Sequence, residues 1–139
     1  MKPIQMADLV GQYEKIKTEV HQAWDEVLNS AAFINGPQVK EFTASLANYL
    51  GVKHVIPCAN GTDAIQAALM ALDLPRGSEV ITPSFSYAAL AEMIIHVGLK
   101  PVFVEVNPDT FTIDIDSIEP VITDKTKVIA PVHLYGQCA

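Results

Sequence analysis

The chain has 139 residues, half of them hydrophobic and 18% charged, and its formal net charge is −7. This composition is typical of a folded globular protein and excludes a disordered chain. The acidic balance and a single arginine, Arg76, leave no basic face, so general nucleic-acid binding is not expected.

The cysteines and histidines predict neither a disulfide framework nor a metal site. Cys58 and Cys138 form no C-x-x-C pair, and the four histidines show no metal-ligand spacing. We therefore expect a reducing compartment, the cytoplasm. The polar N-terminus lacks the apolar core of a signal peptide, and no apolar run is long enough to span a bilayer, so no membrane partner is expected.

Residues 1–52 have the apolar spacing of helices and are expected to form an N-terminal helical segment. Apolar residues recur at helical spacing from Tyr13 to about Ser30. A second helix is expected after Gly36, with Pro37 in its first turn and Gly51 just past its end. Its predicted buried face holds Val39, Phe42, Leu46, Tyr49 and Leu50.

From residue 53 onward, strands are expected to alternate with helices. Short apolar runs lie at 54–57, 79–82, 101–106 and 127–132, and helical stretches lie at 62–72, 86–96 and near 116–122. This rhythm predicts an α/β fold with a largely parallel sheet, covered on both faces because the runs are apolar throughout. No helix follows the last run, so we expect this domain, residues 53–139, to continue beyond Ala139.

The loop from Asn60 to Asp63 joins the first predicted strand to a helix, at the end of the sheet where α/β proteins bind ligands. Gly61 allows a ligand to approach the backbone, and the amides of Thr62 and Asp63 at a helix N-terminus favour a phosphate. The alternative is that Thr62 or Asn60 only caps the helix. The loop lacks the G-x-G-x-x-G pattern of dinucleotide sites, so a single phosphate fits better.

Two further loops follow predicted strands. In the loop from Thr82 to Tyr87, Phe85 or Tyr87 could stack on a flat heterocycle, or both could belong to the core. After the fourth run, His133 could act as an acid or a base, or could orient another group. The alternative is that His133 is a structural residue with satisfied hydrogen bonds.

Six short motifs follow one another along almost the whole chain: Ile4–Leu9, Phe33–Pro37, Tyr49–His54, Asn60–Ala64, Glu79–Pro83 and Pro131–Gln137. In order and spacing they resemble the DegT/DnrJ/EryC1/StrS family of pyridoxal-phosphate-dependent sugar aminotransferases. That family has the type I, aspartate-aminotransferase-like fold. The resemblance implies that residues 53–139 are the N-terminal part of its cofactor-binding α/β large domain.

The resemblance also implies a cofactor, a reaction and partners. Gly61, Thr62 and Asp63 would hold the phosphate of pyridoxal 5'-phosphate, and Tyr87, or Phe85 as second choice, would stack on the pyridine ring. Gly136 and Gln137 would pass near the cofactor. The implied reaction transfers an amino group from an amino-acid donor, glutamate being expected, to a nucleotide-linked ketosugar. The full-length protein is expected to be a cytoplasmic homodimer.

No catalytic residue is assigned within the chain, because none of its lysines matches the family's nucleophile motif. The resemblance places the Schiff-base lysine beyond Ala139, together with the carboxylate that pairs with the pyridine nitrogen and the small C-terminal domain. We therefore expect the chain alone to be inactive. Two alternatives stay open: a non-catalytic phosphate-cofactor-binding or regulatory module, and a cofactor-dependent sugar dehydratase in which histidine replaces that lysine.

Overall fold

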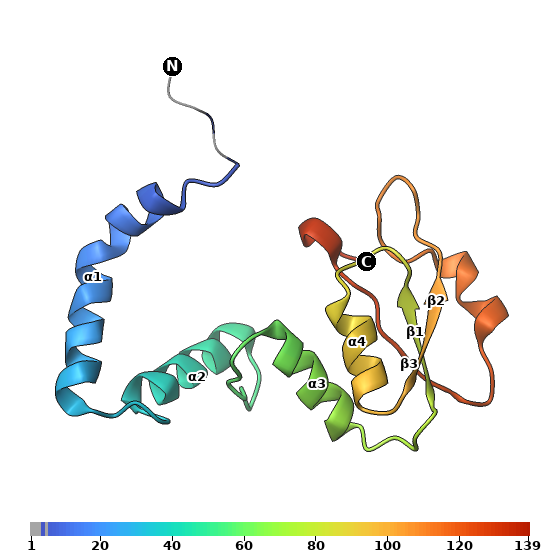
Figure 1. The fold of residues 1–139 in the computed structure, drawn as a ribbon, viewed down its shortest axis with the longest axis horizontal. Coiled ribbons are helices and arrows are strands. Elements are labelled where there is room, and N and C mark those ends of the chain that lie inside the picture. Colours follow the sequence, from blue (N-terminus) through green and yellow to red (C-terminus); the bar gives the residue numbers. More distant parts are fainter. Residues whose placement is uncertain (1–3, 5) are drawn as a thin grey trace. The chain divides into compact units, whose positions relative to one another are not determined.

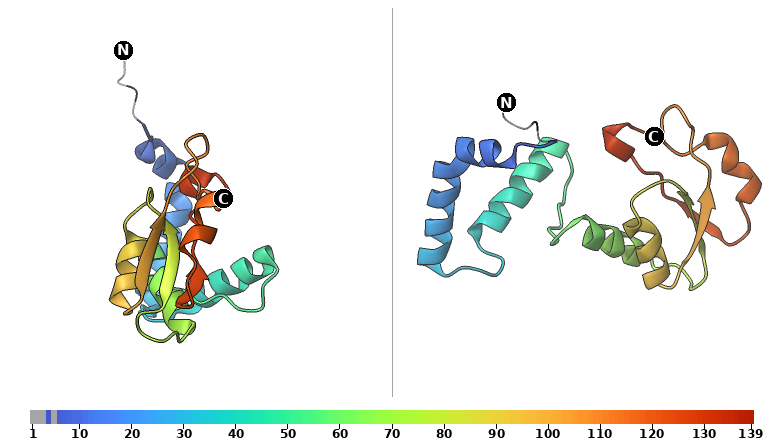
Figure 2. Two further views of the ribbon diagram at one scale, coloured as in Figure 1. Left: turned by 90° about the vertical axis from the view of Figure 1, so that its right-hand side faces the viewer. Right: turned by 45° about the horizontal axis from the view of Figure 1, so that its top comes forward.

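The structure, a computed structural model, describes residue 4 and residues 6–139. Gln5, a member of the first motif, lies outside the described residues. The chain divides into two units, one that ends at Pro57 and one that runs from Cys58 to Ala139. Figure 1 labels the helices and strands of both units, and Figure 2 gives two further views.

Two helices lie in the described residues of the first unit, and their ends follow from local sequence. Helix α1 (Leu9–Ser30) begins after Asp8, whose carboxylate accepts a hydrogen bond from the Gly11 amide at 2.9 Å. Helix α2 (Pro37–Leu50) begins with proline and ends at Gly51, which takes the left-handed conformation with φ of 67°. Both predicted helices are therefore confirmed.

The burial predicted for the apolar face of α2 is wrong. Phe42, Tyr49 and Leu50 are 57%, 85% and 56% exposed, and Val39 and Leu46 are half-buried. Within the described part of the chain, no residue of α1 or α2 is buried. Helical periodicity identifies an apolar stripe, but it does not tell which segment covers that stripe.

The second unit is a three-stranded parallel sheet with helices and single helical turns. Its sheet has the order β2-β1-β3, and Val80 of β1 pairs with Pro101 of β2 and with Val128 of β3. This confirms the predicted α/β class and the parallel strands. The elements in chain order are α3 (Gly61–Ala71), β1 (Glu79–Pro83), α4 (Ala89–His96), β2 (Lys100–Val104), the 3-10 turns η1 (Ile115–Ser117) and η2 (Glu119–Val121), β3 (Thr126–Ile129) and the turn η3 (Leu134–Gly136).

The strand predicted at residues 54–57 is not formed. Val55 is half-buried and Ile56 is 84% exposed, and no strand of the described residues pairs with this segment. A strand needs a hydrogen-bonding neighbour, and the apolar run by itself cannot provide one.

Both faces of the central strand β1 are covered, as the continuous apolar run predicts. On one face Val80 packs with residues of α3, α4 and the turn before β2: Leu69, Ile94 and Leu99. On the other face Ile81 packs with Val104 and Ile113. Figure 1 accordingly shows α4 on one side of the strands and the orange turns η1 and η2 on the other.

A buried carboxylate links the strands at the amino end of β1. Glu79, 5% exposed, accepts hydrogen bonds from the Thr123 hydroxyl at 2.6 Å and from the Lys100 ammonium at 2.9 Å. The Thr123 hydrogen bond, followed by that of Lys100, lowers the pKa of Glu79. The Glu79 amide also donates to the Lys125 carbonyl at 2.8 Å. These bonds connect β1 to β2 and to the segment before β3.

Candidate active site

The start of α3 presents two free backbone amides. Asn60 caps the helix: its side-chain oxygen accepts a hydrogen bond from the Asp63 amide at 2.9 Å, and its side-chain nitrogen donates to the Asp63 carboxylate at 3.2 Å. The amides of Gly61 and Thr62 donate to no residue that the structure describes. Within the predicted phosphate loop, the Asp63 amide is therefore already hydrogen-bonded to Asn60. The amides of Gly61 and Thr62 remain available to a ligand.

Open space adjoins the Gly61 backbone. A Cβ atom placed on Gly61 would have no heavy atom within 4 Å beyond its own neighbours. A ligand can therefore approach the backbone at this point, where the helix dipole carries partial positive charge. The capping interpretation and the phosphate interpretation are compatible, because Asn60 caps one amide and leaves two.

A cavity of about 320 Å³ opens one turn further along α3, at the carboxyl edge of the sheet. It joins α3, the loop after β1, the start of α4 and the segment after β3. Its lining includes Ile65, Tyr87, Leu90, Pro131 and His133. The structure thus brings together Tyr87 and His133, which were predicted from separate strand ends, beside the first turns of α3.

Phe85 and Tyr87 have different surroundings, although they are two residues apart. Tyr87 is 80% exposed and lines the cavity. Phe85 is 49% exposed, and its ring lies 5.8 Å from that of Phe111, tilted by 45°. Neither residue is buried in the core. The ring of Phe85 already has an aromatic partner, whereas the faces of Tyr87 are open.

Phe111 is a contributor to this region that the sequence did not point to. It adopts a left-handed backbone conformation with φ of 57°, which is uncommon for an aromatic residue. Its amide donates to the Asn107 carbonyl at 2.8 Å, which closes a short loop after β2. The sequence signal for this loop is the turn chemistry of Asn107-Pro108-Asp109, but that signal does not reveal the contact with Phe85.

His133 holds the segment that follows β3. Its ring Nδ1 accepts a hydrogen bond from the Ala139 amide at 3.0 Å. The Gly136 amide donates to the His133 carbonyl at 3.2 Å, and Gly136 itself has φ of 83°. One ring nitrogen of the exposed His133 is therefore hydrogen-bonded within the chain, and the same residue also lines the cavity. Gly136 and Gln137 are exposed.

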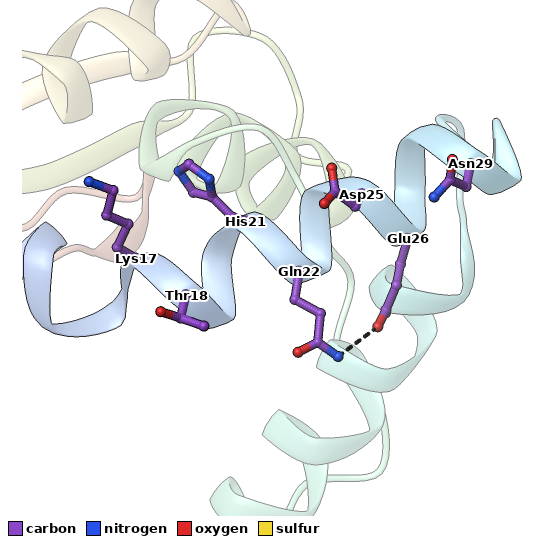
Figure 3. A pocket seen from close by; sticks show the side chains of 7 residues that line it. All are labelled: Lys17, Thr18, His21, Gln22, Asp25, Glu26 and Asn29. Carbon is purple, nitrogen blue, oxygen red and sulfur yellow. Dashed lines mark hydrogen bonds between the residues drawn. The ribbon is translucent and has the colours of Figure 1, made fainter.

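A larger concavity, about 530 Å³, lies in the first unit along one side of α1 (Figure 3). Its lining side chains all come from this single helix and mix both charges with amides and hydroxyls: Lys17, Thr18, His21, Gln22, Asp25, Glu26 and Asn29. Gln22 donates to the Glu26 carboxylate at 3.3 Å. None of the predicted site residues belongs to it, and it is a solvated helix face.

Neither a metal cluster nor a membrane-spanning helix occurs among residues 4 and 6–139. No three histidine, cysteine, aspartate or glutamate side chains gather there in an arrangement that could hold a metal ion. None of the helices in that part of the chain is long and apolar enough to cross a membrane.

The three-stranded parallel sheet with its helices belongs to the type I, aspartate-aminotransferase-like fold. A family model described as the DegT/DnrJ/EryC1/StrS aminotransferase family matches residues 14–139, and the chain belongs to this family.

Three relatives illustrate the match. The chain is 48% identical over 136 residues to the pleiotropic regulatory protein of Geobacillus stearothermophilus, covering 98% of this chain and 37% of that protein. It is 46% identical over 136 residues to the UDP-2-acetamido-2-deoxy-3-oxo-D-glucuronate aminotransferase of Pseudomonas aeruginosa, covering 98% and 38%. The crystal structure of NtdA from Bacillus subtilis, with bound cofactor PMP, is 41% identical with a TM-score of 0.87, covering 90% and 29%. The chain thus spans well under half the length of each.

Proposed function

We propose that this chain provides the phosphate-binding and ring-stacking part of a pyridoxal-phosphate-dependent aminotransferase. The whole protein would transfer an amino group from an amino acid, with glutamate as the expected donor, to a nucleotide-linked ketosugar. The observation that carries this proposal is the pair of free amides on Gly61 and Thr62, one helical turn from a cavity lined by Tyr87. Membership of the aminotransferase family and the sugar-nucleotide relative from Pseudomonas aeruginosa support it.

The residues present fit pyridoxal phosphate. The amides of Gly61 and Thr62 and the Thr62 hydroxyl are donors suited to a phosphate at a helix N-terminus. We assign Asp63 to the same loop, where its bonds to Asn60 fix the start of α3. Tyr87 would stack on the pyridine ring, and Phe85 is the second choice because Phe111 occupies its ring. When bound, the cofactor supplies an electron sink, while the protein holds and orients it.

Further features of the whole protein are part of the same proposal. We propose a homodimer that works in the cytoplasm, and a chain divided into a helical segment, residues 1–52, and a cofactor-binding α/β part, residues 53–139. No residue of this chain is assigned as the catalytic nucleophile. The dehydratase alternative shares the same phosphate loop and differs at the nucleophile.

A regulatory role is a second candidate function. The observation that favours it is the 48% identity to a relative named as a pleiotropic regulatory protein. Both functions would use the phosphate loop at α3. Amino transfer to a nucleotide-linked ketosugar, measured with the full-length protein, separates them.

The phosphate loop is tested by replacing Thr62 with alanine and measuring pyridoxal phosphate binding by equilibrium dialysis. A hydrogen bond to a charged group contributes about 1.5–3 kcal/mol, so we expect the dissociation constant to rise about tenfold or more. Thr18→Ala, an exposed threonine on α1, is the matched control and should bind as the unaltered chain does. Equal binding by both variants would mean that Thr62 has no part in holding the phosphate.

A further inference from the structure

A second cavity of the α/β unit lies between α4 and the sheet, with a volume of about 230 Å³. Its floor is formed by Thr82 and Phe103, which are direct register partners on β1 and β2. Thr82 lies on the same face of β1 as Val80, which packs under α4. Leu90 and Ala91 of α4 lie opposite this floor, and Ser84, Ser86 and Tyr87 line the cavity from the loop between β1 and α4.

The Thr82 side chain is a buried hydroxyl without a partner. Thr82 is 2% exposed, and its hydroxyl forms no hydrogen bond with any residue that the structure describes. In the same part of the chain, every fully enclosed side-chain nitrogen or oxygen has a hydrogen-bond partner. The Thr82 hydroxyl must therefore be open to the cavity, because it would otherwise be an enclosed group without a partner.

The amino end of α4 adds free backbone donors at the same place. Its cap residue is Ala88, whose methyl side chain cannot accept a hydrogen bond. The first hydrogen bond of the helix runs from the Glu92 amide to the Ala88 carbonyl. The amides of Ala89, Leu90 and Ala91 consequently donate to no described residue. Two of these three residues line the cavity, and the helix dipole makes this end partly positive.

The charge of the lining favours a negatively charged ligand. Among the described residues no charged side chain lines the cavity, and the carboxylate of the first turn, Glu92, is exposed and is not among the lining residues. What converges there is a set of groups that can donate: backbone amides and the hydroxyls of Thr82, Ser84 and Ser86. Such donors, without a carboxylate among them, are complementary to an oxyanion.

We propose that this cavity is a second ligand site, which binds a small oxyanion through the Thr82 hydroxyl and the free amides of α4. The ligand group is a carboxylate or a phosphate, since both present several acceptor oxygens. The site differs from the phosphate loop at α3. Ser86, Tyr87 and Leu90 line both cavities, whereas Thr82 and Ala91 line only this one. The proposal does not depend on the cofactor assignment.

The test is a titration of the 139-residue chain with inorganic phosphate, followed by the backbone amide signals in nuclear magnetic resonance at constant ionic strength. We expect the signal of Ala91, a residue that does not line the cavity beside α3, to shift in a saturable manner. Thr82→Val keeps the shape of the side chain and removes the hydroxyl, so the dissociation constant read from this signal should rise about tenfold. In Thr62→Ala the Ala91 signal should respond as in the unaltered chain, and only the response of the α3 loop should change.

Parallel titrations identify the source of the oxyanion. Acetate should produce the same shifts, and the tighter of the two probes identifies carboxylate or phosphate as the natural group. Should Thr82→Val lose the dispersed spectrum of a folded chain, Ser84→Ala takes its place, because Ser84 is exposed and its substitution leaves the core intact. The proposal is overturned by an absence of saturable shifts, by unchanged binding in the folded variant, by loss of the Ala91 response in Thr62→Ala, or by equal shifts with neutral glucose.

Discussion

The different surroundings of two neighbouring aromatic residues can be tested by replacing each with alanine. Tyr87 is 80% exposed beside the α3 cavity, whereas Phe85 packs against Phe111. We expect Tyr87→Ala to weaken the binding of pyridoxal phosphate and to leave the free energy of unfolding almost unchanged. We expect Phe85→Ala to do the opposite, because it removes a contact within the fold.

The size of each effect follows from the geometry. An aromatic stacking pair contributes about 0.5–1.5 kcal/mol, so Tyr87→Ala should raise the dissociation constant for the cofactor about two- to tenfold. A buried phenylalanine costs about 3–5 kcal/mol on truncation, and half-exposed Phe85 should lose about 1–2 kcal/mol. Tyr87→Phe retains the ring and serves as the matched control.

Equilibrium dialysis measures the dissociation constant, and urea unfolding followed by circular dichroism measures the stability. Weaker cofactor binding by Phe85→Ala than by Tyr87→Ala, with the stability of the fold unchanged, would contradict this assignment. In that case Phe85, and not Tyr87, would be the stacking residue.

Two further predictions concern the sheet. Glu79 has a lowered pKa in the fold, so its contribution to stability is present above the ordinary glutamate pKa of about 4.3 and is lost as the pH falls through the lower folded value. Urea midpoints of the unaltered chain and of Glu79→Gln should therefore converge on acidification, and a constant difference between them would contradict the assigned ion pair. Ile94 is fully buried under β1, so Ile94→Ala should lower the free energy of unfolding by about 2–5 kcal/mol. The neighbouring Ile95→Ala, 62% exposed, should change the stability by less than about 0.5 kcal/mol in the same assay, and equal losses would mean that the core is misplaced.

Local sequence predicted those elements whose ends are set by local chemistry. Pro37 and Gly51 mark the two ends of α2 because each restricts or permits particular backbone angles within a single turn. Where a partner distant in sequence decides the outcome, the prediction failed. The apolar run at 54–57 pairs with no described strand, and the stripe of α2 that includes Phe42 is exposed.

The candidate site shows the same division between local and distant information. The position of Gly61 and Thr62 at a helix start could be read from their neighbours, and the family resemblance supplied their role. The hydrogen bond from the Asp63 amide to the Asn60 side chain depends on the rotamer of Asn60. The choice between Phe85 and Tyr87 depends on Phe111, whose ring approaches from a different strand end and leaves no signal in the intervening sequence.

The order of strands in the sheet constrains the sequence of events in which the second unit folds. The innermost strand, β1, is the one made first on the ribosome, and its neighbours β2 and β3 follow it only later. The backbone hydrogen bonds of β1 therefore need partner strands that come later in the sequence. Such pairing between distant segments slows folding, because the intervening loops must close before the hydrogen bonds form. Until Thr126–Ile129 emerges, one edge of this apolar strand is open to any extended segment nearby, so the nascent chain is most exposed to mispairing during that interval.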